Sequence, residues 1–343
     1  MKIKFIAEEF TPGCLQHGAI DVSWPDLVWA ATTYGKKHGY LWGSSSGFAR
    51  AERQYRTYLL YSCLKQVSKS PFKTHGYSAM DATEKGAASY FLGMTLAKLS
   101  AERLLDTPWV WHISSGSQAL SFLTGKSRPD MLGLDTSGRW IVLEAKGRSG
   151  KLDMDALHSA KNQTRMVGTI NGAAPFCRVG VQSYFDPDLR VYLLDPEPLD
   201  EALPIKFDID KAMDEYYGFR HVLKNFGQDR KISNIEYLVF DETETGVKIG
   251  LPKAIVEDYD RLKISGILGK IPARNIIPMS FTSENFDVSS ELSRRISFIA
   301  KLQDDDNQAQ ELKNNSGLYA DGFFIELDER WDVKNMTLEP FNR

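Results

Sequence analysis

Apolar residues recur at helical spacing in several segments, most regularly between positions 81 and 105. Asp81 or Thr83 can cap the start of that helix, because a short polar side chain there accepts hydrogen bonds from free backbone N–H groups. One face of the helix carries an apolar stripe made of Ala88, Phe91, Leu92, Thr95 and Leu99. The same periodicity predicts further helices at Trp24–Lys36, Phe48–Val67, Lys151–Ile170, Ile209–Leu223, Pro252–Leu262 and Ser289–Leu302.

Short runs of β-branched and aromatic residues, bounded by turn-forming residues, predict the strands. The turn Thr136–Arg139 contains a glycine and separates two such runs, which is typical of a β-hairpin. The two strands of that hairpin are expected at Asp130–Asp135 and Trp140–Gly147. Further strands are expected at Lys2–Ala7, Trp109–Ile113, Cys177–Tyr184, Arg190–Leu194, Ile235–Phe240, Val247–Leu251 and Gly322–Leu327.

Helices and strands therefore alternate through the middle of the chain, which predicts an α/β fold, α+β overall. The 343 residues are enough for two domains, or for one large domain with additions. The proline-rich segment Asp195–Pro198 is our predicted end of the central domain. We expect an N-terminal region at 1–75, a core at 76–200 and a C-terminal α+β region at 201–343, in which no chemical signature is found.

The overall charge of −3 does not favour a polyanionic partner, so any such site must come from local clustering of charge. One basic cluster stands out against a single acid, Glu52, and a solvated face is an equally good interpretation of it. It comprises Arg50, Arg53, Arg56, Lys65, Lys69 and Lys73.

The cysteines and the apolar runs exclude several classes of protein. The three cysteines are far apart in the chain, which argues against a disulfide framework and against a structural zinc site. The N-terminal segment is too acidic, and its apolar run too short, for a signal peptide. No run of eighteen apolar residues occurs, so no membrane span is expected, and a cytoplasmic location fits.

Three charged residues meet at one end of the predicted hairpin. Glu144 and Lys146 are two positions apart on a strand and therefore point to the same face, whereas Ala145 points to the other side. Asp130, at the start of the preceding strand, is expected to lie across from them. Two carboxylates so close repel each other unless a cation lies between them, and oxygen ligands suit Mg²⁺ or Mn²⁺. A second acid-x-Lys triplet, Asp229–Lys231, has flanks typical of a loop.

Pro129-Asp130, thirteen intervening residues and then Glu144-Ala145-Lys146 resemble the PD-(D/E)XK, or restriction-endonuclease-like, nuclease superfamily. The resemblance covers about Ser78–Leu194. It implies an αβββαβ core with a mixed central sheet and Mg²⁺-dependent cleavage of nucleic acid. It also implies that Asp130 and Glu144 bind the metal, that the Ala145 carbonyl completes the shell, and that Lys146 is the catalytic lysine.

The resemblance draws attention to two more residues. Glu84 shares a helical stripe with Phe91, Thr95 and Leu99, so we expect it to face the sheet and reach the metal. The alternative for Glu84 is a charge favoured by the helix dipole. Gln163 shares a stripe with apolar residues of the following helix, and an inward glutamine needs hydrogen-bond partners. One branch of the family has such a glutamine with tyrosine four residues later, where this chain has Val167.

Taken together, these features predict a Mg²⁺-dependent (endo)deoxyribonuclease, with Mn²⁺ as a possible substitute. The resemblance suggests an effector of bacterial restriction or anti-phage defence that acts on DNA, with a helicase or ATPase partner, and a homodimer is plausible. The basic segment 50–73 is the candidate DNA or partner surface. Two alternatives stay open: an inactive nuclease-fold scaffold that binds a partner, and an RNA-directed nuclease, because the metal acts on the phosphate whichever sugar is present.

Overall fold

The computed structural model describes residues 1–10, 15–34, 47–113, 128–195, 202–257 and 315–331. Its centre is a seven-stranded sheet with the order β2-β1-β10-β9-β7-β6-β5. The sheet is mixed, because β7 pairs with β9 and β1 pairs with β10 in parallel, whereas the other neighbours are antiparallel. Its strands are β1 Lys2–Glu8, β2 Leu15–Asp21, β5 Trp109–His112, β6 Met131–Leu134, β7 Trp140–Gly147, β9 Cys177–Phe185 and β10 Leu189–Leu194.

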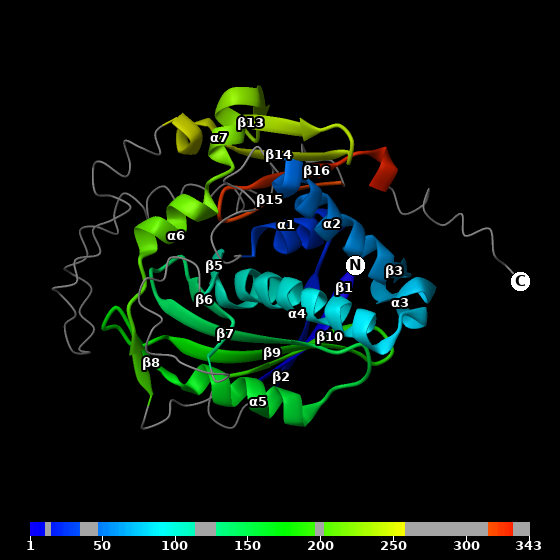
Figure 1. Cartoon of the computed structure of the whole chain (residues 1–343), viewed down its shortest axis with the longest axis vertical. Coiled ribbons are helices and arrows are strands. Elements are labelled where there is room, and N and C mark those ends of the chain that lie inside the picture. The colour runs from blue at the N-terminus through cyan, green and yellow to red at the C-terminus, as the bar shows by residue number, and fades with distance from the viewer. Residues whose placement is uncertain (11–14, 35–46, 114–127, 196–201, 258–314, 332–343) are drawn as a thin grey trace, which may run out of the picture.

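Two helices cover the two faces of this sheet (Figure 1). On one face, α4 (Ala82–Leu105) begins at Asp81, whose carboxylate accepts hydrogen bonds from the backbone of the first turn. On the other face lies α5 (Met154–Arg165), which packs against β9 and β7. Along the chain, α4 is followed by β5, β6 and β7, and then by α5, β8 (Val167–Ile170) and β9. The ends of β6 and β7 lie between the two helices.

A further layer lies on the outer side of α4 (Figure 1). Helix α1 (Trp24–Thr33) packs against α4 and against α2 (Gly47–Cys63). Beyond them is an antiparallel sheet with the order β12-β13-β14-β16-β15. Its strands are β12 Gln228–Ile232, β13 Ile235–Glu242, β14 Val247–Pro252, β15 Ser316–Leu318 and β16 Phe324–Leu327. The remaining elements are β3 Leu64–Val67, β4 Ser70–Lys73, α3 His75–Ala79, β8 Val167–Ile170, β11 Leu203–Ile205, α6 Ile209–Tyr216, α7 Arg220–Phe226 and a 3-10 turn at Glu329–Trp331.

Buried polar contacts tie this outer layer to α4. Lys98 of α4 is fully buried and donates a hydrogen bond to the Tyr216 hydroxyl at 3.1 Å. That hydroxyl in turn donates to Asp321 at 2.6 Å, and the Trp29 indole N–H donates to the same carboxylate at 3.0 Å. Apolar residues from all three predicted regions belong to one continuous core. The N-terminal strands thus extend the central sheet, and the C-terminal region packs against α1, α4 and strand β5.

The predicted mixed α+β architecture is confirmed, with differences at the ends of several elements. The helix predicted at Lys151–Ile170 ends at Arg165 and is followed by β8. The helix predicted at Phe48–Val67 ends at Cys63, because the chain reverses at Ser68 (φ 56°) to form the hairpin of β3 and β4. The helix predicted at Ile209–Leu223 is two helices, α6 and α7. The structure also contains β2, β4, β11, β12, β15 and the short helix α3, which the hydrophobic pattern did not predict.

Two further predictions concern the C-terminal region. Asp229–Lys231 lies within β12 rather than in a loop, and Arg230 pairs with Glu326 of β16 at 2.7 Å. The predicted helix Ser289–Leu302 and the end of Pro252–Leu262 lie outside the described residues.

The basic segment 50–73 is exposed only in part: Lys65 and Lys69 are exposed, whereas two arginines of α2 are buried. Arg53 is 4% exposed and pairs with Glu242 of β13, while Arg56 is 3% exposed and donates to the Ala31 carbonyl of α1 at 2.8 Å. Arg50 pairs with Glu244 at 3.0 Å. Arg53 and Arg56 are therefore used within the fold, and the prediction of a DNA-binding face on this helix was wrong for these two residues.

Candidate active site

The predicted hairpin forms with a register that brings Asp130 opposite Glu144. Met131 and Leu143 form the outermost backbone pair of β6 and β7. In the same register, Asp130, just before β6, lies opposite Glu144. Side chains complete the pairing: the Asp130 N–H donates to Oε2 of Glu144 at 2.7 Å, and the Ala145 N–H donates to Oδ2 of Asp130 at 3.1 Å. The two carboxylates are thus held against each other by backbone N–H groups.

Lys146 joins this pair from the same face of β7. Its Nζ donates to Oε1 of Glu144 at 2.5 Å and to Oε1 of Gln163 on α5 at 2.9 Å. The Gln163 amide N–H₂ donates to the Arg128 carbonyl at 3.4 Å, just before β6. The predicted convergence of Asp130, Glu144 and Lys146 is confirmed, and Gln163 lies beside them. Period-two alternation along a strand is the reason the lysine and glutamate meet.

The electrostatic state of Glu144 reflects its surroundings. Its side chain is 2% exposed, and burial, together with the negative charge of Asp130, raises the pKa of the carboxyl to about 8. The hydrogen bond and positive charge of Lys146 act in the opposite direction. A carboxyl group that is buried against a second carboxylate is stabilised in its charged form by a nearby cation.

The donor set at this point consists of oxygens. Among the described residues, no three side chains of His, Cys, Asp or Glu form a ligand set for a metal ion. The Ala145 N–H donates to Asp130. Because the N–H and C=O of one strand residue point to the same side, the Ala145 carbonyl also points toward Asp130 and can add a third oxygen to the two carboxylates. Hard oxygen donors with room for water suit Mg²⁺, which is commonly held by one or two carboxylates and keeps several waters. The residues present therefore fit the predicted ion.

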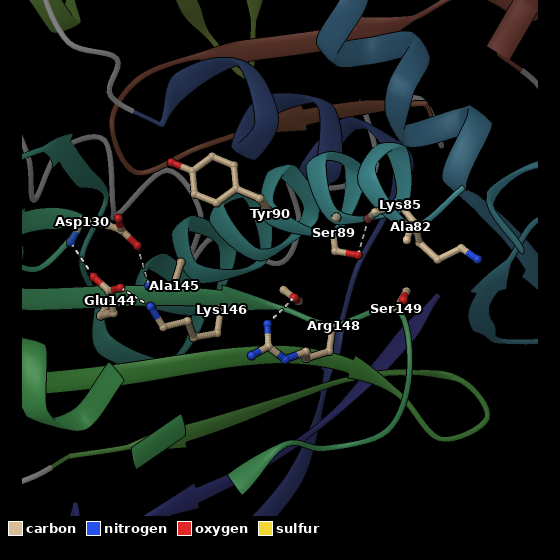
Figure 2. Close-up of a pocket in the computed structure, with 12 residues that line it drawn as sticks. Ala82, Lys85, Ser89, Tyr90, Asp130, Glu144, Ala145, Lys146, Arg148 and Ser149 are labelled. Atoms are coloured by element: carbon tan, nitrogen blue, oxygen red, sulfur yellow. Dashed lines mark hydrogen bonds and ion pairs between the residues drawn. The ribbon is translucent and has the colours of Figure 1, made fainter. Parts of the chain in front are cut away.

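A cleft of about 540 Å³ opens beside these carboxylates, between the start of α4 and the end of β7 (Figure 2). Its volume is in the usual range for ligand sites. Tyr90 lines the α4 side and Arg148 the strand side, and the sequence reasoning missed both. One sequence signal could have found Tyr90: it lies four positions after Gly86, and residues at this spacing share one face of a helix. The cleft is lined by Ala82, Lys85, Gly86, Ser89, Tyr90, Asp130, Glu144, Ala145, Lys146, Gly147, Arg148 and Ser149.

The structure does not bring Glu84 to this cleft. The Glu84 side chain is exposed. Its charge acts instead on Cys63 at the end of α2: burial is the main cause that raises the pKa of this thiol, and the negative charge of Glu84 adds to it. The stripe that Glu84 shares with Phe91 faces α1 and α2, since the Phe91 ring meets the rings of Tyr34 and Tyr55. The expectation that this stripe faces the sheet was wrong.

No protein-family model, curated protein or solved structure matches this chain. The function is therefore inferred from the site itself. In the ranges that the structure describes, none of the helices combines the length and the apolar character that crossing a bilayer requires.

Proposed function

We propose that this protein is a divalent-metal-dependent nuclease that hydrolyses phosphodiester bonds of DNA with the restriction-endonuclease-like arrangement of residues. One observation supports this most directly. The buried Glu144 carboxylate contacts the Asp130 backbone on one side and the Lys146 ammonium on the other, at the wall of an open cleft. Paired carboxylates can hold a metal ion that activates water for phosphodiester hydrolysis, and a nearby lysine can stabilise the charge that develops on the phosphate.

Each residue has a role that follows from its contacts. Asp130, Glu144 and the Ala145 carbonyl would hold Mg²⁺ or Mn²⁺. When bound, such an ion lowers the pKa of a coordinated water and neutralises charge on the phosphate. Glu144 and Gln163 hold the Lys146 ammonium at a fixed position on the cleft wall. From there it can donate a hydrogen bond to a phosphate oxygen and stabilise the charge that grows during hydrolysis.

The test is cleavage of supercoiled plasmid in the presence of Mg²⁺. We expect Glu144→Gln and Lys146→Met to lower the initial rate by roughly 100-fold or more, which is the usual cost of removing a group that stabilises a transition state. EDTA should abolish cleavage by the parent protein. Glu84→Gln is the matched control, because it removes the same charge from an exposed position outside the cleft. Cleavage that survives both site variants, or falls equally in the control, contradicts the proposal.

Metal binding gives a second readout that does not depend on turnover. Mn²⁺ should raise the melting temperature of the parent protein, because a ligand that binds only the folded state stabilises it. Asp130→Asn should lose most of this shift. A parent protein that binds metal and DNA without cleaving either strand would instead be the inactive scaffold. Labelled DNA and RNA offered to the same preparation distinguish a deoxyribonuclease from an RNA-directed enzyme.

A further inference from the structure

Two exposed tyrosines lie on neighbouring helices beside the cleft. Tyr90 of α4 is 52% exposed and lines the cleft, and Tyr55 of α2 is 59% exposed. The Tyr55 ring meets the edge of Phe91, the residue that follows Tyr90, with ring centroids 6.4 Å apart. The Phe91 ring also contacts Tyr34, with ring centroids 5.9 Å apart, so Tyr55 packs on an aromatic cluster that includes the neighbour of Tyr90 in the chain.

The Tyr90 ring also lies next to the carboxylates. Figure 2 shows it projecting from α4 on the Asp130 side of the cleft. Partial burial raises the pKa of the Tyr90 hydroxyl, and the negative charges of Asp130 and Glu144 add to the effect. Of the two exposed rings, Tyr90 therefore lies at the proposed site of hydrolysis, and Tyr55 lies outside the cleft against the next residue of α4.

Cations line the strand side of the same cleft. The Arg148 side chain is 38% exposed, and its Nε is held by Asp153 at 2.9 Å. Lys146 lies two positions earlier on the strand. One wall of the cleft thus offers the Tyr90 ring, and the other offers positive charge. Proteins that bind a single strand combine these two features, because bases stack on aromatic faces while the phosphates follow the cations.

We propose that Tyr90 and Tyr55 stack unpaired bases, so that the substrate of this site is single-stranded DNA, or a single-stranded end or flap. The hydrolytic part of this statement rests on the proposed function, whereas the stacking part does not. A flexible single strand can place consecutive bases on the two rings and its backbone beside Arg148. In an intact duplex, the faces of the bases are covered by their neighbours in the stack.

The experiment measures binding without turnover. Fluorescence anisotropy in EDTA compares a labelled oligonucleotide of roughly 12 nucleotides with the duplex of the same sequence. We expect the single strand to bind more tightly. Tyr90→Ala and Tyr55→Ala should each weaken its binding by about 5- to 100-fold, as expected for the loss of one stacked base. Tyr90→Phe and Tyr55→Phe keep the rings and should bind as the parent does.

Phe226→Ala is the control, because Phe226 is 61% exposed on α7 and does not line the cleft. The inference is overturned if the alanine variants bind the single strand unchanged, if the phenylalanine variants lose as much, or if the duplex binds better. A change of oligomeric state in the alanine variants, with unchanged DNA binding, would identify the rings as a protein contact instead. If the alanine variants bind the single strand more weakly but the parent protein cleaves no DNA, the proposed hydrolysis is refuted and the stacking is not. If the parent cleaves DNA but the alanine variants bind the single strand as the parent does, the stacking is refuted and the hydrolysis is not.

Discussion

Gly93 of α4 and Gly147 of β7 touch backbone to backbone at the cleft. A Cβ atom on Gly93 would lie 2.7 Å from the Gly147 nitrogen, and one on Gly147 would overlap the Ser89 carbonyl. Neither position has room for a side chain. This close approach seats the middle of α4 on the end of the strand that carries Glu144 and Lys146, next to the cleft.

The first prediction follows from this contact. Gly93→Ala should destabilise the protein by about 1–3 kcal/mol, because extra atoms in a closely packed contact force the backbone to shift. Gly86 is the matched control in the same helix, since a Cβ there meets nothing within 4 Å. Gly86→Ala should stabilise the protein by about 1 kcal/mol, because alanine favours the helix. Urea unfolding measures both, and equal effects of the two substitutions would contradict the packing explanation.

The second prediction concerns Gln163, which acts through Lys146 and is a positioning residue. Gln163→Ala removes one of the two acceptors that hold the ammonium, so the rate of plasmid cleavage should fall by about 10- to 100-fold, as for other supporting residues around metal sites. The loss should fall on kcat more than on KM. Gln163→Glu retains an acceptor oxygen and should recover part of the rate. The exposed neighbour Asn162 is the control, and an Asn162→Ala variant as slow as Gln163→Ala would speak against positioning.

The third prediction concerns the buried ion pair that joins α2 to β13. Arg53 and Glu242 are 4% and 2% exposed, and the Arg53 Nε donates to the carboxylate at 2.8 Å. Glu242→Ala should cost about 3–5 kcal/mol of unfolding free energy, because it leaves a buried charge unpaired. The double variant Arg53→Met, Glu242→Leu should cost clearly less.

An exposed ion pair gives the control for this experiment. Lys253 and Asp229 lie 2.8 Å apart, with side chains 30% and 70% exposed. Asp229→Ala should cost less than about 1 kcal/mol, since solvent screens such pairs. A similar cost for Asp229→Ala and Glu242→Ala in denaturant unfolding would show that burial does not set the strength of the pair.

The fourth prediction is a pH dependence of stability. Burial raises the pKa of Glu102 from 4.5 to about 7, although Arg103 opposes the shift. Between these two values the folded state binds a proton that the unfolded state has released. Stability should therefore fall as the pH rises from about 4.5 to 7, by at most about 1.4 kcal/mol per pH unit from this group.

Glu102→Gln removes the titrating carboxyl group, so the stability of this variant should change less with pH across the same window. The difference between the parent and variant profiles reports Glu102 together with its effect on the buried neighbours Lys98 and Asp321. Glu236→Gln, at an exposed position on β13, should keep the parent profile. Thermal melts at intervals between pH 4.5 and 8 measure all three proteins, and parallel profiles for parent and Glu102→Gln would refute the assignment.

The hairpin and its charged end could be predicted from the sequence because the interactions that set them are local. Side chains alternate along a strand, so the spacing of Glu144 and Lys146 places them on one face. The short turn at Thr136–Arg139 sets the register that brings Asp130 opposite Glu144. The α4 helix was predicted for a similar reason, since its cap and its period lie within one segment.

The errors at Glu84 and in the basic helix have a different cause. A helical stripe identifies which residues share a face, but not which part of the fold covers that face. Phe91 and Glu84 share a stripe, and it is α1 and α2 that lie against it. The charge of Arg53 was visible in the sequence, but its partner Glu242 is 189 positions away.

By itself, the sequence determined the alternation of helices and strands, the hairpin and the meeting of its three charged residues. These depend on backbone periodicity and on turn length, which act over a few neighbouring positions. Only the tertiary structure decided that Tyr90 and Arg148 line the same cleft and that Arg53 and Arg56 of α2 are buried. Those outcomes depend on which distant surfaces pack together, and the free energy that selects them comes from burying the whole core at once.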